Sequence, residues 1–224
     1  MNQYISIIPL RAGSRGLVSK NTFPLNNKPL YMYSVEQALL TTSQIYISTD
    51  IQSIIDTDLS PNITVLRRKN HLASDQIPMH DVLLDIFKYL DLKETIVVLL
   101  QATSPLRNVQ DIKNAIQMYE TNKYSMVMSV KEEDSKILKY GFLDEDSYKP
   151  IHNIASVFMN RQDLPKIYTP NGAIYIFSVK DFLINSFYPT EKIGAYLMPS
   201  IRSIDIDNLE DMKIASKLLM NLKK

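Results

Sequence analysis

Short apolar runs that alternate with helical patterns are the feature of this sequence that most constrains its fold. The first run, residues 4–9, is rich in β-branched side chains and almost continuously apolar, as expected of a strand buried on both faces of a parallel sheet. Similar runs predict strands at residues 44–48, 64–66, 95–100, 125–130 and 173–178, and an extended stretch at 203–206. Helical spacing of apolar side chains predicts helices at residues 30–40, 51–55, 79–90, 109–119 and 209–222, and a short helix follows Lys180. Strands that alternate with helices imply right-handed crossovers and a doubly wound, mostly parallel α/β sheet.

The alternation is interrupted once, over residues 131–169. This stretch contains charged clusters, two prolines and only weak strand signals near residues 139–143. The whole chain has 224 residues, of which 45% are hydrophobic, a size that suits one α/β core with a small appendage. We therefore predict a single domain over residues 1–224, with residues 131–169 as an inserted flap or subdomain.

Charge and composition narrow the classes of partner. Lys and Arg total 25 against 24 for Asp and Glu, so the chain lacks the basic excess of a protein that binds nucleic acid. There is no cysteine, which excludes disulfides and thiolate metal sites and suits a reducing compartment. No apolar run reaches the length of a membrane span, and no basic leader precedes the first apolar run. We expect a cytoplasmic protein with neither a nucleic-acid nor a membrane partner.

A glycine-containing loop follows the first predicted strand. The chain has only five glycines, and Gly13 and Gly16 both lie in this loop. Backbone N–H groups there can approach a polyphosphate, and Arg11, Arg15 and Lys20 add positive charge. A nucleoside triphosphate would fit, although neither common phosphate-binding fingerprint is present and a solvated basic turn is the alternative.

A pair of carboxylates lies near the carboxyl terminus. Asp205 and Asp207 are two residues apart on an extended segment, so they share one face while Ile204 and Ile206 point toward the core. Two carboxylates beside a triphosphate are typical ligands of Mg²⁺. The alternative is that Asp207 or Asn208 only caps the helix that follows.

Several segments in this order resemble the acylneuraminate cytidylyltransferases, the CMP-sialic acid synthetase family. They are residues 8–16 with Lys20 and Asn21, then residues 48–50, 72–75, 99–107, 170–175 and 203–207. Together they span nearly the whole chain. The resemblance implies a Rossmann-like nucleotidyltransferase fold and a reaction in which CTP and a nonulosonic acid give a CMP-sugar and pyrophosphate, with Mg²⁺ as the cofactor.

The resemblance also implies roles for individual residues. Those expected around the triphosphate and ribose are Arg11, Ser14, Arg15, Gly16, Lys20 and Asn21, with Arg68 near the cytosine. Those expected to face the sugar acid are Gln101, Lys139, Arg161 and Asn171. The catalytic set would be Arg11, Arg15 and Lys20 on the phosphates, and Asp205 and Asp207 on the metal. A sugar acid brings a carboxylate and hydroxyls, for which cationic and amide side chains are suitable partners. At the lysine position, Lys136 is an alternative to Lys139.

Other features leave the substrate open. Arg15 stands where the family commonly has lysine, Ala102 where proline is common, and Thr169 where arginine is frequent. A cytidylyltransferase for an eight-carbon sugar acid and a non-catalytic sugar-nucleotide-binding protein are the alternatives.

Asp50 lies too far from the glycine loop for a dinucleotide-type ribose contact, so we predict a local structural role. The family resemblance places a dimerisation element in residues 131–169, which predicts a homodimer.

Overall fold

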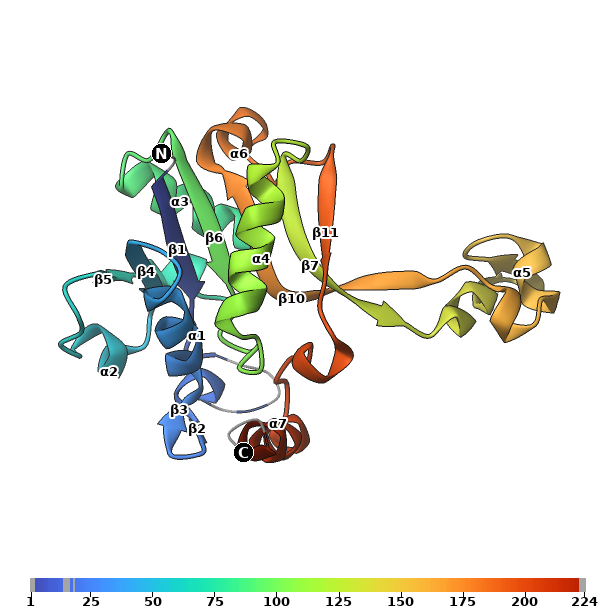
Figure 1. Ribbon diagram of the computed structural model, residues 1–224, viewed down its shortest axis with the longest axis horizontal. Coiled ribbons are helices and arrows are strands. Elements are labelled where there is room, and N and C mark those ends of the chain that lie inside the picture. Colours follow the sequence, from blue (N-terminus) through green and yellow to red (C-terminus); the bar gives the residue numbers. More distant parts are fainter. Residues whose placement is uncertain (1–2, 14–16, 18, 222–224) are drawn as a thin grey trace.

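The computed structural model of the chain describes residues 3–13, 17 and 19–221. At its centre is a seven-stranded sheet with the strand order β11-β7-β10-β6-β1-β4-β5 (Figure 1). The strands are β1 (Gln3–Pro9), β4 (Gln44–Thr49), β5 (Ile63–Arg67), β6 (Thr95–Leu100), β7 (Met126–Glu133), β10 (Ile167–Ser178) and β11 (Ile193–Leu197). Strand β10 runs antiparallel to β6 and β7, and the other neighbouring pairs are parallel. The predicted mostly parallel α/β fold is therefore confirmed.

Helices cover both faces of this sheet. They are α1 (Leu30–Leu39), α2 (Gln52–Ile55), α3 (Met79–Tyr89), α4 (Val109–Glu120) and α6 (Val179–Asn185). Helix α7 (Leu209–Asn221) instead lies beyond the ends of the strands, where it packs against Leu25 and Leu30 (Figure 1). Strand β6 explains why both faces must be covered: Val98 and Leu100 pack in the cluster that includes α1 and α4, while Val97 and Leu99 pack in the cluster that includes α3 and α6. None of the helices in the described part of the chain is long and apolar enough to cross a membrane.

The edge of the sheet differs from the sequence prediction. Strand β11 was not predicted, because Ile193 and Leu197 are exposed on its outer side and Gly194 interrupts the pattern. Strand β10 is twice as long as the predicted strand at residues 173–178. Residues 203–206 join no strand of the described sheet and instead contact the loop after β6, where the N–H of Ile206 donates to the carbonyl of Thr103 at 2.8 Å.

Residues 131–169, which we call the arm, project away from the sheet (Figure 1). The ends of β7 and β10 pair along it, and its tip holds β8 (Gly141–Asp144), β9 (Ser147–Pro150) and α5 (Ile154–Phe158). At the root of the arm the register of β10 on β7 shifts between Pro170 and Tyr175. Gly172 has φ 75° there, a left-handed conformation that favours glycine. A small hairpin of β2 (Pro24–Leu25) and β3 (Lys28–Pro29) precedes α1.

Candidate active site

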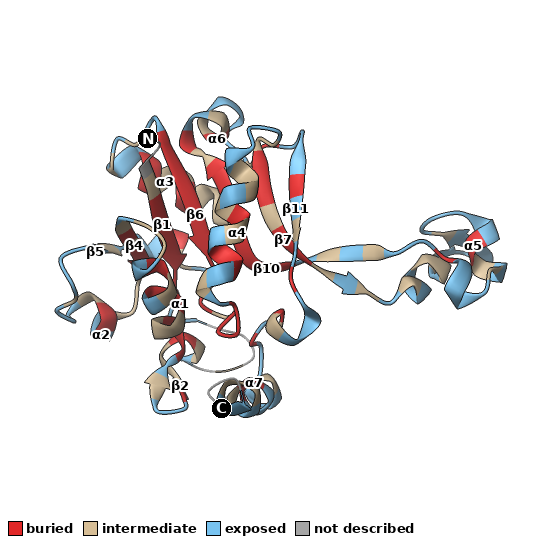
Figure 2. Ribbon diagram, viewed as in Figure 1, coloured by how far each residue is buried: buried red, intermediate tan, exposed pale blue. Residues whose placement is uncertain are grey.

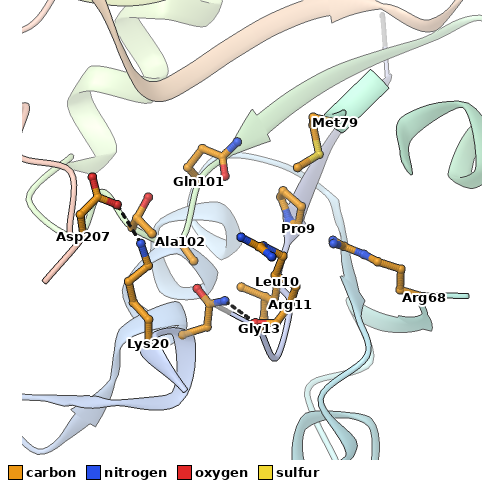
Figure 3. Close-up of a pocket in the computed structure, with 12 residues that line it drawn as sticks. Pro9, Leu10, Arg11, Gly13, Lys20, Arg68, Met79, Gln101, Ala102 and Asp207 are labelled. Atoms are coloured by element: carbon orange, nitrogen blue, oxygen red, sulfur yellow. Dashed lines mark hydrogen bonds and ion pairs between the residues drawn. The ribbon is translucent and has the colours of Figure 1, made fainter. Parts of the chain in front are cut away.

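A cavity of about 380 Å³ opens where β1, β5 and β6 end. It is lined by Pro9, Leu10, Arg11, Gly13, Lys20, Asn21, Arg68, Met79, Gln101, Ala102, Thr103 and Asp207 (Figure 3). Crevices at the carboxyl ends of parallel strands are the usual ligand sites of open α/β sheets. We call this cavity the nucleotide pocket. It brings together the glycine-containing loop, the loop after β6 and one of the two predicted metal ligands.

The loop after β1 is held in place by neighbouring elements. The N–H of Ala12 donates to Oδ1 of Asp50 at 2.8 Å, which confirms the local structural role predicted for Asp50. Nδ2 of Asn21 donates to the carbonyl of Arg11 at 2.9 Å, and the Arg11 guanidinium forms an ion pair with Asp75. These contacts position the first cation at the mouth of the nucleotide pocket.

Three residues with predicted roles in CTP binding cannot be placed. Ser14, Arg15 and Gly16 lie outside the described residues. The described part of the loop nevertheless places Arg11 and Gly13 on the pocket wall, and Lys20 enters from the 3-10 turn that follows the loop.

Arg68 enters the pocket opposite Asp207 and Lys20 (Figure 3). Its side chain is buried, and Nη2 and Nε donate to the carbonyl and hydroxyl of Ser48 at 3.0 and 3.3 Å. Burial lowers the pKa of Arg68 to about 10, an effect that the nearby negative charge of Asp50 opposes. A desolvated cation at a pocket wall is suited to a polar or anionic group of a ligand.

The two carboxylates of the predicted metal site lie on residues 203–208, which we call the acidic segment. Nζ of Lys20 lies 3.0 Å from Oδ1 of Asp207, and 73% of the Asp207 side chain is exposed. The hydrophobic side chain of Ile206 is fully buried beneath α7, as its alternation with the carboxylates predicts. No group of three or more His, Asp or Glu side chains that could hold a metal occurs among the described residues.

Capping of α7 belongs to a different residue. Oδ1 of Asn208 accepts the N–H groups of Glu210 and Asp211 at 2.8 and 3.1 Å, and Oδ2 of Asp211 accepts the N–H of Asn208 at 3.0 Å. This reciprocal pair satisfies the first turn of the helix. Asn208 is therefore the cap, and the side chain of Asp207 faces the nucleotide pocket instead.

Asp205 is partly desolvated although one side of it remains exposed. Burial raises the pKa of its carboxyl, and the negative charges of Asp207 and Asp211 add to this shift, while a hydrogen bond with Thr103 and the charge of Lys20 oppose it. Negative charge is thus concentrated at one edge of the pocket. Such an edge fits a divalent cation, which would relieve the repulsion between the carboxylates.

A second cavity of about 470 Å³ shares Met79 and Gln101 with the nucleotide pocket. We call it the aromatic pocket, since its wall includes Tyr175, Phe187 and Tyr188. Burial raises the pKa of Tyr175, and the charge of Asp205 adds to the shift, so the acidic segment lies close to both cavities. Gln101, which was expected to face the sugar, lines both pockets, and Figure 3 shows it on the wall of the nucleotide pocket.

Arg107 links the end of β6, which carries Gln101, to β10. It is fully buried and donates from Nη1 to the carbonyls of Gln101 and Ala173 at 3.3 and 2.5 Å and from Nη2 to the Ser34 hydroxyl at 2.7 Å. Burial lowers the pKa of Arg107, and these acceptors compensate the charge. The end of β6 is therefore fixed to β10 directly behind Gln101.

Two of the residues expected to face the sugar lie elsewhere. Lys139 and Arg161 are in the arm, where Lys139 donates to the carbonyl of Met159 and Arg161 pairs with Asp134 at 3.2 Å. Neither lines the nucleotide or the aromatic pocket of this chain. The arm projects away from both pockets of this chain (Figure 1), so the contact of Lys139 and Arg161 with the sugar stays a prediction.

Asn171 also differs from expectation. Its side chain is buried, and its amide is engaged by Ser129, Ser203 and the N–H of Ala173. It lines neither pocket. The donor and acceptor of this buried amide are both paired with protein groups, and the predicted contact with the sugar stays a prediction.

Sequence reasoning missed several residues of the two pockets. Thr103 and Tyr175 lie inside segments that carry the family resemblance, so their positions could have been noted from those segments. The same holds for Asp75, which pairs with Arg11 of the nucleotide pocket. Met79 and Tyr188 lie in ordinary helical or loop sequence, and no local signal marks them.

The fold and the two adjoining pockets define a nucleotide-binding α/β protein with a cationic loop and a carboxylate pair at the strand ends. A family model described as cytidylyltransferase matches residues 5–202, and the chain belongs to this family. It is 34% identical over 212 residues to an N-acylneuraminate cytidylyltransferase of Streptococcus agalactiae serotype V, which covers 92% of this chain and 51% of that protein. The chain thus spans about half the length of this relative.

A second relative matches over nearly its full length. The CMP-N,N'-diacetyllegionaminic acid synthase of Legionella pneumophila is 31% identical over 225 residues, which cover 96% of this chain and 95% of that protein. Among solved structures, a CMP:2-keto-3-deoxy-manno-octonic acid synthetase complexed with CTP superposes with a TM-score of 0.69 at 14% identity, covering 99% of this chain and 100% of that one. At such low identity this similarity shows the fold alone.

Proposed function

We propose that this protein is a CTP-dependent cytidylyltransferase that activates a nonulosonic acid as its CMP-sugar. The observation that carries the proposal is the junction of two pockets at Gln101. One pocket presents cations and Asp207 of the carboxylate pair, as a metal-bound triphosphate requires. The other has an aromatic wall of a size suited to a sugar acid with acyl groups. The relatives named for N-acylneuraminate and diacetyllegionaminic acid support this substrate class.

The nucleotide would occupy the pocket between Arg68 and Asp207. Arg11 and Lys20 stand on the side of the glycine-containing loop, where they can bind the phosphates together with Arg15. Arg68 follows β5 and lines the same pocket, where it would contact the base. Backbone N–H groups near Gly13 can approach the phosphates closely, since no side chain intervenes there.

Mg²⁺ is the cofactor that the carboxylate pair best fits. Asp205 and Asp207 would hold it, and their mutual repulsion in its absence favours a cation between them. When bound, the ion would neutralise charge on the phosphate oxygens. Lys20 would then be released from Asp207 and become available to the triphosphate.

The reaction would be a direct displacement at the α-phosphorus. The anomeric hydroxyl oxygen of the sugar forms the new bond to phosphorus, the bond to the β-phosphate oxygen breaks, pyrophosphate leaves and the hydroxyl proton is released. Arg11 and Lys20 stabilise the charge that develops on the phosphates, and Gln101 orients the sugar. Little covalent chemistry is required of the protein, so positioning and charge stabilisation account for most of the acceleration.

The arm suggests how the sugar half of the site is completed. It exposes large apolar side chains, which are Ile137, Tyr140, Phe142, Leu143, Tyr148, Ile151, Ile154, Phe158 and Tyr168. Such a concentration on a small projecting element is typical of an association surface. We propose a homodimer formed through the arm, in which Lys139 and Arg161 of one copy approach the aromatic pocket of the other. A cytoplasmic location is part of this proposal, because it supplies CTP and suits a chain without cysteine.

Mass spectrometry of products formed from CTP and a panel of sugar acids tests the proposal. The expected product is a CMP-sugar from at least one nine-carbon acid, together with pyrophosphate. An exclusive product from an eight-carbon acid would shift the assignment to that substrate class. Binding of CTP without any pyrophosphate release would support a non-catalytic protein.

A further inference from the structure

The buried Asn171 at the root of the arm connects three parts of the molecule. It lies in the bulge where β10 leaves the sheet, and only 6% of its surface is exposed. Oδ1 accepts from the hydroxyl of Ser129 on β7 at 2.5 Å and from the N–H of Ala173 at 3.2 Å. Nδ2 donates to Oγ of Ser203 at 2.8 Å and lies 3.4 Å from Sδ of Met198. Every polar atom of this amide is therefore directed at the protein.

Ser203 is the first residue of the acidic segment. Immediately before it, Arg202 makes a bidentate ion pair with the buried Asp111 of α4, at 2.7 Å from Nη2 and 3.0 Å from Nε. Three residues after it, the N–H of Ile206 donates to the carbonyl of Thr103 at 2.8 Å. Asp205 lies between these two attachments in the sequence. Its own carboxyl is held by a hydrogen bond with Thr103, and the bond from Asn171 holds the chain two residues before it.

A segment that joins no sheet depends on such ties for its geometry. Residues 203–207 make no strand pairing, so hydrogen bonds to the surrounding elements decide where the two carboxylates point. Small displacements of ligating groups reduce both metal affinity and turnover, and partners that orient ligands typically change metal affinity 10- to 100-fold when they are removed. The bond between Asn171 and Ser203 is well placed to have this effect.

We propose that Asn171 is a positioning residue that orients Asp205 and Asp207 through Ser203, and that it does not bind the sugar. The inference rests on the proposed function, because it assigns a role in that same site. It also connects the arm to the acidic segment, since Asn171 joins β7 and β10 at the point from which both strands enter the arm.

The variants Ser203→Ala and Asn171→Ala remove the same hydrogen bond from opposite ends. We expect each to raise the Mg²⁺ concentration for half-maximal turnover about 10-fold or more, with the sugar KM within about twofold of the original value. Because both variants remove the bond between Asn171 and Ser203, the double variant should resemble Asn171→Ala in its metal requirement rather than multiply the two effects. Ser6→Ala is the matched control. Ser6 is a buried serine of β1, and its hydroxyl lies 2.8 Å from that of Thr42, away from the acidic segment.

A binding measurement separates this inference from the proposed function. Titration of the full chain with Mn²⁺ in the presence of CTP, followed by electron paramagnetic resonance, should show weaker metal binding in both variants and unchanged binding in Ser6→Ala. If the unsubstituted protein forms no CMP-sugar, the proposed function fails, while this titration still decides the role of Asn171.

Two results would overturn the inference. One is a raised sugar KM in Asn171→Ala with an unchanged metal requirement, which identifies a sugar ligand. The other is an unchanged metal requirement and unchanged Mn²⁺ binding in Ser203→Ala. If Asn171→Ala fails to fold, as judged by circular dichroism, Ser203→Ala alone decides.

Discussion

The nucleotide pocket and the arm differ in how completely one chain builds them. Residues around the pocket are fixed by neighbours: Arg68 is buried against β4, and Ile206 is anchored in the core behind the carboxylates. The arm leaves 82% of Phe158 and 78% of Leu143 exposed, and Figure 2 shows little buried surface along it. A single chain thus contains the proposed CTP half of the site, whereas the residues expected to complete the sugar half stand on an element that lacks a covering surface.

The largest expected effect is on the nucleotide side of this comparison. Asp205→Asn and Asp207→Asn should each fold normally and lose about 100-fold or more in turnover, or roughly 2.7 kcal/mol of transition-state stabilisation, because the charge that would hold Mg²⁺ is removed. Steady-state kinetics over a range of Mg²⁺ concentrations, together with thermal melts, measure both properties.

An exposed carboxylate away from both pockets supplies the control. Asp58→Asn should leave turnover unchanged. Because Asn208 is the cap of α7, substitution of Asp207 should not weaken the start of that helix. Near-original rates in both site variants at low-millimolar Mg²⁺, with unchanged stability, would contradict the metal assignment.

The next effect concerns the sugar side. Arg161→Ala should weaken sugar binding about 10- to 100-fold, as expected for loss of a charge-assisted hydrogen bond, and leave CTP binding nearly unchanged. Lys166→Ala is the matched control, since Lys166 is another exposed arm cation paired with a carboxylate, at 3.2 Å from Glu132. Calorimetric titrations with each substrate separate the outcomes. A loss of CTP affinity in Arg161→Ala would show that Arg161 belongs to the CTP half of the site and would contradict its assignment to the sugar.

The next prediction concerns the arm and a twofold difference in mass between a dimer and a single chain. Light scattering at micromolar concentration should give twice the 25.7 kDa of the chain, and Phe158→Asp should reduce this to one chain by placing a charge on the arm surface. Leu40→Asp, at a site that is 66% exposed on the core, should keep the dimer. A monomeric mass for the unsubstituted protein would contradict the proposed dimer.

The smallest expected effect is a thermal shift that tests the base. With Mg²⁺ present, CTP should raise the melting temperature by several degrees more than ATP, GTP or UTP at equal concentration, since only a ligand that binds the folded state stabilises it. Arg68→Lys should reduce the difference among nucleotides, because lysine keeps the charge but loses the planar set of donors. Equal shifts with all four nucleotides would remove the assignment of cytosine.

The parts of this molecule that the sequence predicted share a local cause. Residues 95–100 read as a doubly buried strand because both faces of β6 are covered by helices, and Asp205 and Asp207 alternate with Ile204 and Ile206 because period-two alternation survives in any extended segment. The glycine-containing loop was recognisable because glycine is scarce in this chain. These predictions depended on residue types and on spacings within a few residues of one another.

Sequence alone therefore determined the α/β class, the cationic loop and the carboxylate pair, whereas tertiary structure decided which residues meet. β11 has no distinctive pattern because one of its faces remains exposed at the sheet edge, and the antiparallel direction of β10 depends on a long connection through the arm. Asn171 and Arg161 are both polar residues in the sequence, yet one is buried in a closed hydrogen-bond network and the other stands on the arm. Burial and partner geometry arise from contacts between residues distant in the chain, so they became available only once those segments were packed together.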